Sequence, residues 1–161
     1  MIASVNGVAA GAGAGLALAC DYVIAAKSAS FVIAFVNVGL SLDTATSFHL
    51  VRNIGLKRAF ALATLGDRLP AEQALEWGLI NQVVEDEQLE EATHVLALRY
   101  AAQAPKALAY IKKLLLRSFE RSYEEALRYE LYYQELAGRT QDYQEGLQAF
   151  VEKRKPIFRG E

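Results

Sequence analysis

The sequence has few of the residues that build disulfides and metal sites. Its 161 residues include one cysteine, Cys20, and two histidines, His49 and His94. A lone cysteine cannot form an internal disulfide, which favours a reducing and therefore cytoplasmic setting. Because these three residues lie far apart and do not match the ligand spacing of a zinc site, we expect no bound metal.

An excess of charge of one sign is also lacking. The chain has 17 Lys and Arg against 19 Asp and Glu, a net charge of −2, and the two signs are interspersed. This balance provides neither a basic surface for nucleic acid nor a polybasic segment for anionic lipid, so we expect neither as a partner. A composition of 53% hydrophobic and 22% charged residues is that of a globular protein with a sizeable core.

Small residues are concentrated near the N-terminus. The stretch NGVAAGAGAGLALACD, residues 6–21, holds four of the 11 glycines. A backbone with so few side chains can adopt positive φ and lets a ligand approach its amide groups. The apolar residues that follow predict a buried helix, whose first N–H groups have no intrahelical acceptor. This stretch is therefore suited to stabilising a developing negative charge.

Two nucleotide-binding patterns do not fit this stretch. A triphosphate-binding loop needs Gly-Lys followed by Ser or Thr, and no lysine precedes Lys27. The dinucleotide fingerprint needs a third glycine or alanine at a fixed offset, where Leu16 and Leu18 stand. A tightly packed turn with a purely structural role remains an alternative.

A membrane helix over residues 2–20 is the more serious alternative. The segment is almost free of polar residues, and Gly7, Gly11 and Gly15 repeat at the four-residue spacing of packed membrane helices. The missing basic flank and the turn signal at Asn6 argue against it.

The hydrophobic patterns predict short strands first and helices afterwards. We expect a helix that begins near Asp43 or Thr44, either of which can cap it. Gly66 suits a helix end and Pro70 a first helical turn. The predicted strands cover 2–5, 21–26, 31–33 and 81–84, and the predicted helices cover 15–20, 56–65, 70–77, 86–104, 105–119, 122–138 and 140–150.

Several motifs follow the glycine-rich stretch in a definite order. They are ASF at 29–31, VGL at 38–40, GDRLPAEQA at 66–74, WGLIN at 77–81 and FVEKRKPIF at 150–158. Taken together they resemble the crotonase family, the enoyl-CoA hydratases and isomerases, over essentially the whole chain. The resemblance implies an α/β fold, with part of a spiral core of ββα turns in residues 1–85. Residues 86–161 would form a helical region that assembles homo-trimers or hexamers.

The same resemblance implies an acyl-CoA thioester as substrate, with no cofactor other than this CoA. Family members have a substantial portion before the glycine-rich stretch, so the chain corresponds to the C-terminal part of a crotonase. Two backbone N–H groups hold the thioester enolate in this family, and such donors contribute roughly 3–4 kcal/mol to lowering the barrier. One maps to Ala12, between Gly11 and Gly13, and the other lies in the portion that precedes.

The acidic positions favour isomerisation over hydration. Hydratases of the family add water with two glutamates, and Gly15 and Phe35 stand at those positions. Asp43 stands where isomerases of the family place a single acid. The segment 33–43 resembles the branch that includes the phenylacetate-pathway ring-epoxide isomerase.

One carboxylate can shift a double bond by taking a proton from one carbon and returning it to another. We expect Asp43 to do so if burial among Phe31, Phe35 and Phe48 desolvates it. An ordinary helix N-cap is the alternative role for this residue. The family has glycines just after this position, whereas this chain has Thr44-Ala45-Thr46, which would narrow an acyl pocket.

The resemblance also implies a set of substrate-binding residues. Lys112 matches a recurrent lysine near the phosphates of CoA, in a helix of the C-terminal region. The full set is Gly11, Gly13, Phe35, Phe48 and Lys112. The alternative from another class is an inactive truncated crotonase that serves only as an oligomerising partner.

Overall fold

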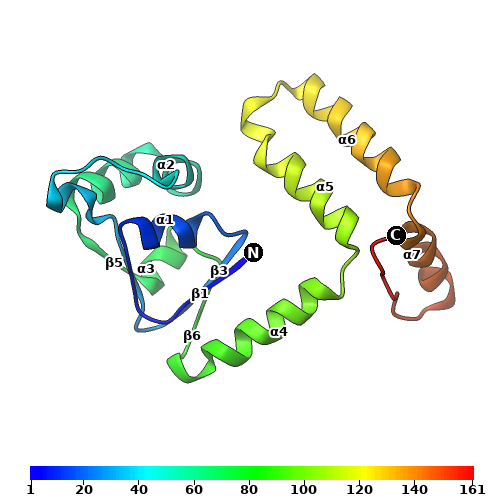
Figure 1. Cartoon of the computed structure of the whole chain (residues 1–161), viewed down its shortest axis with the longest axis horizontal. Coiled ribbons are helices and arrows are strands. Elements are labelled where there is room, and N and C mark those ends of the chain that lie inside the picture. The colour runs from blue at the N-terminus through cyan, green and yellow to red at the C-terminus, as the bar shows by residue number, and fades with distance from the viewer. The chain divides into compact units, whose positions relative to one another are not determined.

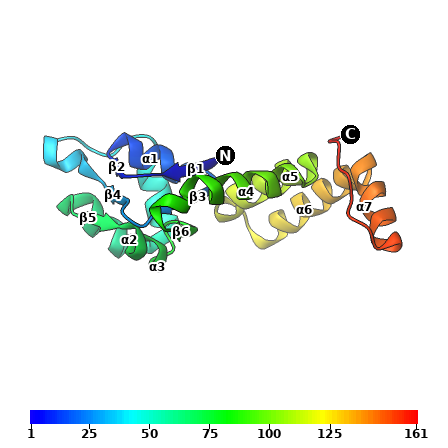
Figure 2. The ribbon, with the colours of Figure 1, turned by 90° about the horizontal axis from the view of Figure 1, so that it is seen from below.

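The computed structural model describes all 161 residues and consists of two compact units, residues 1–97 and 98–161. Figure 1 and Figure 2 show the ribbon of both. Unit 1 combines strands with short helices, and unit 2 is helical. The mixed α/β character agrees with the predicted fold class. The division of roles between residues 1–85 and 86–161 stays a prediction.

Unit 1 contains two sheets of three strands each. In the first, β1 (Ile2–Val5), β3 (Tyr22–Ala26) and β6 (Gln82–Val84) pair in parallel in the order β1-β3-β6. In the second, β4 (Ser30–Val32) pairs in parallel with β2 (Val8–Ala10) and antiparallel with β5 (Arg68–Pro70). The predicted strands are confirmed within a residue or two, whereas β2 and β5 were not predicted.

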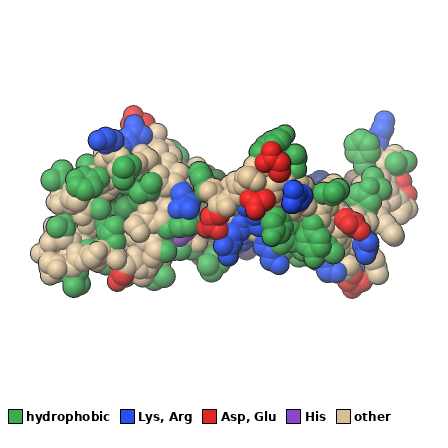
Figure 3. Space-filling model, turned by 90° about the horizontal axis from the view of Figure 1, so that it is seen from above, with side chains coloured by type: hydrophobic (Ala, Val, Ile, Leu, Met, Phe, Trp, Pro, Cys, Tyr) green, Lys and Arg blue, Asp and Glu red, His purple; other side chains and the backbone are tan.

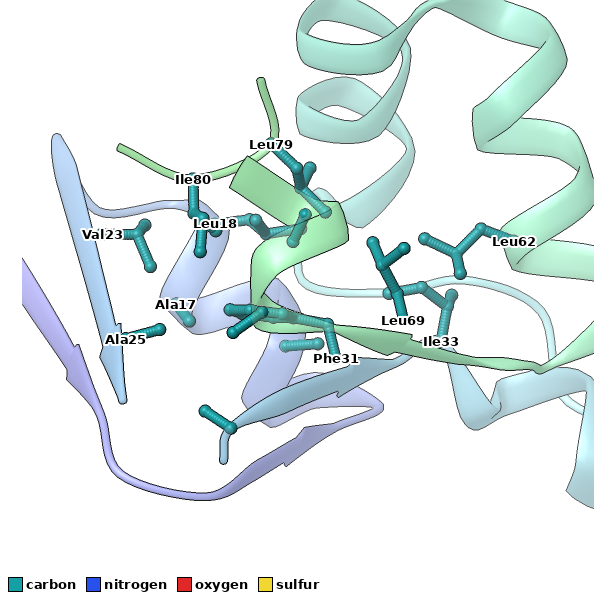
Figure 4. Close-up of a cluster of buried hydrophobic side chains, with 14 of the residues drawn as sticks. Ala17, Leu18, Val23, Ala25, Phe31, Ile33, Leu62, Leu69, Leu79 and Ile80 are labelled. Carbon is teal, nitrogen blue, oxygen red and sulfur yellow. The ribbon is translucent and has the colours of Figure 1, made fainter. Parts of the chain in front are cut away.

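A short helix connects the two sheets. α1 (Ala12–Leu18) links β2 to β3 and buries Ala14, Gly15, Ala17 and Leu18. Figure 4 shows Leu18 and Phe31 pointing into one apolar cluster with Leu69, Leu79 and Ile80. Phe31 is fully buried, and Leu69 is almost so. Because three of the four buried residues of α1 are alanine or glycine, its backbone lies close to this core.

The remaining helices of unit 1 follow β4. These are η1 (Ala34–Val38), α2 (Thr46–Leu65), α3 (Ala71–Glu76) and η2 (Asp86–Gln88). The helical geometry of α2 breaks at Gly55, where φ is 74° and ψ is 162°, so a second helical segment begins at Leu56 as predicted. The N-cap of α2 is Ala45, which makes no side-chain cap. The expectation that Asp43 or Thr44 caps this helix is therefore wrong.

Unit 2 is an array of helices. α4 (Leu89–Ala101) enters it from unit 1, and α5 (Pro105–Leu116), η3 (Ser118–Glu120), α6 (Tyr123–Gly138) and α7 (Gln141–Glu152) follow. Pro105 stands at the first turn of α5, and Ser122 with Glu125 forms a capping box on α6. Figure 1 shows α5 and α6 side by side and antiparallel. The helices predicted after Glu85 are confirmed.

The C-terminal tail folds back onto α7. The buried carboxylate of Asp142 accepts hydrogen bonds from the backbone N–H groups of Arg159 at 2.7 Å and Gly160 at 2.9 Å. Arg154 donates to both carboxylate oxygens of Glu145, at 2.6 and 2.8 Å. These bonds hold the last residues against their own helix.

Unit 2 leaves a large apolar surface uncovered. A groove of about 610 Å³ runs between α5 and α6 and is lined mostly by aliphatic and aromatic side chains. Leu115 and Leu131 in its walls are about two-thirds exposed. Figure 3 shows hydrophobic side chains at the surface of the molecule.

The predicted alternative of a membrane helix over residues 2–20 is wrong. This stretch forms two strands and a helix of seven residues. None of the helices in the chain has the length and apolar character needed to cross a membrane.

Candidate active site

The glycine-rich stretch bends sharply where it enters α1. Gly11 is the N-cap, and its φ of 51° lies in the left-handed region that favours glycine. The Gly11 N–H donates to the Val32 carbonyl at 2.9 Å, which ties the turn to β4. The N–H of Ala12, the first helical residue, has no intrahelical acceptor, and no side chain caps the helix. This amide is available to an oxygen of a ligand.

The surroundings of this turn are open on one side and aromatic on the other. A Cβ added at Gly13 would meet no heavy atom within 4 Å. A Cβ at Gly11 would lie 4.0 Å from the ring of Phe35, which is itself buried. The first turn of α1 therefore has free space beside it and the Phe35 ring near its base.

The two positions where the resemblance implies hydratase glutamates, Gly15 and Phe35, are both buried. Phe35 is 7% exposed, within η1. Gly15 faces the segment before α2: an added Cβ would lie 2.6 Å from Thr46 Oγ1 and 3.0 Å from Thr44 Cβ, and would overlap Thr44 Oγ1. Gly15 therefore leaves no room for a side chain in the present packing.

Asp43 is exposed, contrary to the expectation that phenylalanines would bury it. Phe31 and Phe35 turn into the core, so they leave the carboxylate at the surface. The Thr44 hydroxyl donates to Asp43 Oδ1 at 3.1 Å. Because Thr44 contacts Gly15, one turn after Ala12 in α1, the structure brings the segment of Asp43 beside the first turns of α1.

The backbone after Asp43 is left-handed at two successive residues. Thr44 has φ 48° and Ala45 has φ 56°. This conformation costs a non-glycine residue roughly 1–2 kcal/mol, and it is rarest for β-branched residues such as Thr44. The glycines that the resemblance implies for this segment would adopt it freely. The packing of Thr46, which is fully buried, holds the turn in place.

The Phe48 ring is in contact with Arg52, and this contact was not predicted from the sequence. The guanidinium carbon of Arg52 lies 3.4 Å from the centroid of the Phe48 ring, and the two stand four residues apart on α2. His49 makes an edge contact with the same ring at 5.3 Å. Burial, with a smaller effect of the Arg52 charge, lowers the pKa of His49 below its usual 6.5. The four-residue spacing of an aromatic and an arginine was the available signal.

An apolar pocket of about 330 Å³ lies between η1 with the loop after it and α2. η1 and the loop after it contribute Phe35, Val36, Leu40 and Leu42, and Leu42 immediately precedes Asp43. The opposite wall is a face of α2 that sequence reasoning missed, although its helical spacing was readable: Leu56, Ala59, Phe60 and Ala63. Such a pocket fits a hydrocarbon group.

The predicted residues fall into two groups. Gly11, Ala12, Gly13, Phe35, Asp43 and Phe48 all belong to unit 1. Lys112 is an exposed residue of α5 in unit 2. The chain contains no group of three or more His, Cys, Asp or Glu side chains arranged to hold a metal ion. Unit 1 thus contains an uncapped amide donor at Ala12, an exposed carboxylate at Asp43 and an apolar pocket lined by Leu42.

Curated proteins with similar sequences are acyl-thioester enzymes by name. The chain is 49% identical over 160 residues to the 1,2-epoxyphenylacetyl-CoA isomerase of Escherichia coli, covering 99% of the chain and 61% of that protein. It is 40% identical to a probable enoyl-CoA hydratase of Rhodobacter capsulatus, again covering 99% of the chain and 62% of the relative. A trans-2-decenoyl-(acyl-carrier-protein) isomerase of Streptococcus mutans is 39% identical, with 99% and 61% covered. The chain thus spans about three fifths of these relatives.

Solved structures confirm the crotonase fold. An enoyl-CoA hydratase subunit of Geobacillus kaustophilus superposes with a TM-score of 0.95 at 39% identity, covering 100% of this chain and 63% of that one. A putative enoyl-CoA hydratase/isomerase of Mycobacterium abscessus superposes with a TM-score of 0.96 at 36% identity, covering 99% and 62%. The sequence pattern of enoyl-CoA hydratase/isomerase matches residues 1–161. The chain belongs to the enoyl-CoA hydratase/isomerase family, the crotonases.

Proposed function

We propose that the chain carries the acid/base part of an acyl-CoA isomerase site, with Asp43 as the catalytic residue. This proposal rests on the residues at the two positions where the resemblance implies glutamates in hydratases, which are Gly15 and Phe35. Gly15 abuts Thr44 and Thr46, and Phe35 is buried, so neither position supplies a carboxylate. Asp43 then remains as a single carboxylate, and the residue before it, Leu42, lines an apolar pocket. One carboxylate suits proton transfer between two carbons better than the addition of water.

The proposed reaction moves one proton and one double bond. The acyl group of a 3-enoyl-CoA lies in the pocket next to Leu42, and Asp43 removes a proton from C2. The electrons of that C–H bond pass to the thioester, whose oxygen becomes an enolate and accepts a hydrogen bond from the Ala12 N–H. The protonated Asp43 then returns the proton to C4, which gives the conjugated 2-enoyl-CoA. Because Asp43 is exposed in the free protein, the bound substrate itself must exclude water from it.

Two relatives support isomerisation as the reaction class. The proteins of Escherichia coli and Streptococcus mutans are both isomerases by name, one for a ring-epoxide acyl-CoA and one for a decenoyl thioester. We propose substrates of these two kinds. The second oxyanion donor would come from the two fifths of the relatives' length that this chain does not match. Full activity would therefore require both donors.

Unit 2 has two proposed roles. Lys112 on α5 would bind phosphates of CoA, and the apolar surface of α5 and α6 would contact other subunits in a trimer or hexamer. A cytoplasmic setting stays a prediction from the lone cysteine.

Binding and turnover in one sample test the proposal. The chain is titrated with CoA and with a 3-enoyl-CoA by calorimetry, and conjugation of the thioester is followed by its ultraviolet absorbance. We expect Asp43→Asn to abolish turnover while substrate binding persists, because the amide cannot accept the proton. Asp67→Asn, at another exposed acid of unit 1, is the matched control and should behave as wild type.

The other outcomes discriminate between the hypotheses. Equal rates for Asp43→Asn and wild type would refute the role of Asp43. A folded chain that binds neither CoA nor the enoyl-CoA would support the alternative of an inactive protein that only associates with other subunits.

A further inference from the structure

Asp43 is the outer end of a series of three oxygen-bearing side chains. Thr44 Oγ1 donates to Asp43 Oδ1 at 3.1 Å, and the Thr44 and Thr46 hydroxyl oxygens lie 3.2 Å apart. An ionised carboxylate only accepts hydrogen bonds, so the single hydroxyl hydrogen of Thr44 points to Asp43. The Thr46 hydroxyl must then donate to Thr44. Because Thr46 is fully buried, the series has a fixed inner end.

The same series can hold Asp43 after it has taken up a proton. Oδ1 already accepts a hydrogen bond from Thr44, so the proton taken from the substrate goes to Oδ2, and Thr44 continues to donate to Oδ1. Both hydrogen bonds of the series keep their direction, and no heavy atom has to move. A base that takes a proton and returns it passes through both states, and the hydrogen bond from Thr44 is present in each.

The middle of the series, the exposed Thr44, lies against α1 on one side. The absence of a side chain at Gly15 leaves the space that the Thr44 and Thr46 hydroxyls occupy. The left-handed backbone at Thr44 and Ala45 aims these side chains at α1. A conformation this unfavourable for threonine persists only where the surroundings determine it.

We propose that Thr44 is a positioning residue, which holds the Asp43 carboxyl in one orientation whether it is ionised or protonated. Thr46 and the gap at Gly15 hold Thr44 in turn. This inference rests on the proposed function of Asp43 as the base. Thr44 acts through Asp43, and its own side chain is directed to Asp43 and α1 rather than to a substrate.

Two substitutions separate the hydroxyl from the shape of Thr44. Thr44→Val keeps the branched side chain and removes the hydrogen bond, whereas Thr44→Ser keeps the hydroxyl and removes a methyl group. In the double-bond shift of a 3-enoyl-CoA we expect Thr44→Val to lower kcat about fivefold with KM unchanged, because the loss concerns the transition state. Thr44→Ser should stay within about twofold of wild type. Equal kcat for the valine variant and wild type would overturn the inference and leave the function of Asp43 intact.

A second measurement does not depend on turnover. The scalar couplings between Hα and Hβ of Asp43, measured by NMR on the whole chain, report whether its χ1 angle occupies one rotamer or several. We expect unaveraged couplings in wild type and Thr44→Ser, and averaged couplings in Thr44→Val. If Asp43→Asn isomerises as fast as wild type, the proposed function fails, and the couplings alone decide the inference: averaging already present in wild type overturns it.

Discussion

Replacing Gly15 by alanine tests the packing that supports the candidate base. Gly15 lies inside α1 without left-handed φ, so alanine would gain about 1 kcal/mol in helix propensity. Against this, the new Cβ would lie 2.6 Å from Thr46 Oγ1 and would overlap the Thr44 hydroxyl. Overpacking of this kind costs about 1–3 kcal/mol. We therefore expect Gly15→Ala to destabilise unit 1 by up to about 2 kcal/mol, once the propensity gain is subtracted.

The single tryptophan provides the assay. Trp77 is half-buried in unit 1, so urea unfolding followed by its fluorescence reports the stability of this unit. Gly13→Ala is the matched control, because it changes the same helix at a position where a Cβ meets nothing within 4 Å. This control should equal wild type or exceed it by up to about 1 kcal/mol.

A double-mutant cycle assigns the destabilisation to the threonine. In a Thr44→Ala background the hydroxyl that a Cβ at position 15 would overlap is absent, and only the contacts with Thr46 and the Cβ at position 44 remain. The penalty of Gly15→Ala should then fall, with a coupling energy of at least about 0.5 kcal/mol. If Gly15→Ala proves as stable as Gly13→Ala, or if the cycle shows no coupling, the reasoning about this contact is refuted.

Two further predictions concern unit 2. Hydrogen bonds from Arg154 and from the Ile157 N–H lower the pKa of Glu145 from 4.5 to about 2, so its contribution to stability is present above pH 4.5 and is lost as the pH falls towards 2. Thermal unfolding followed by circular dichroism should show a shallower loss between pH 5 and 2 for Glu145→Gln than for wild type, and parallel curves would contradict this. Ser122→Ala removes the capping box of α6 and should destabilise unit 2 by about 1 kcal/mol, whereas no change in its urea midpoint would show that the cap is dispensable.

Local patterns predicted most of the fold. The strand at 2–5 is bounded by a turn signal, and the helices after Glu85 have clear apolar spacing with Pro105 and Ser122 at helix starts. The strands β2 and β5 have three residues each, too few for an alternating pattern, and each forms by pairing with β4. Such strands depend on distant partners, which a single sequence does not show.

The family was predictable from the sequence, whereas the roles of the site residues stay predictions and their environment was only partly foreseen. The order of motifs placed Asp43 and Ala12, and the comparisons confirm the family that this order indicated. The exposure of Asp43 was not foreseen, because Phe31 and Phe35 turn into the core. The N-cap at Ala45 was not foreseen either, because the backbone at Thr44 and Ala45 is left-handed. Neither residue type favours that conformation, so the sequence contains no local signal for it.

Two features that look unrelated in the sequence are one steric arrangement in the structure. Gly15 lacks the carboxylate of a hydratase, and the segment 44–46 carries threonines where the resemblance implies glycines. The structure places these hydroxyls where a side chain at position 15 would stand. A glutamate introduced at position 15 alone would therefore collide with Thr44 and Thr46 before it could position a water. The space beside Gly15 can hold either a glutamate side chain at position 15 or the threonine hydroxyls that hydrogen-bond towards Asp43, but not both. A larger residue at position 15 would therefore require smaller residues at positions 44 and 46.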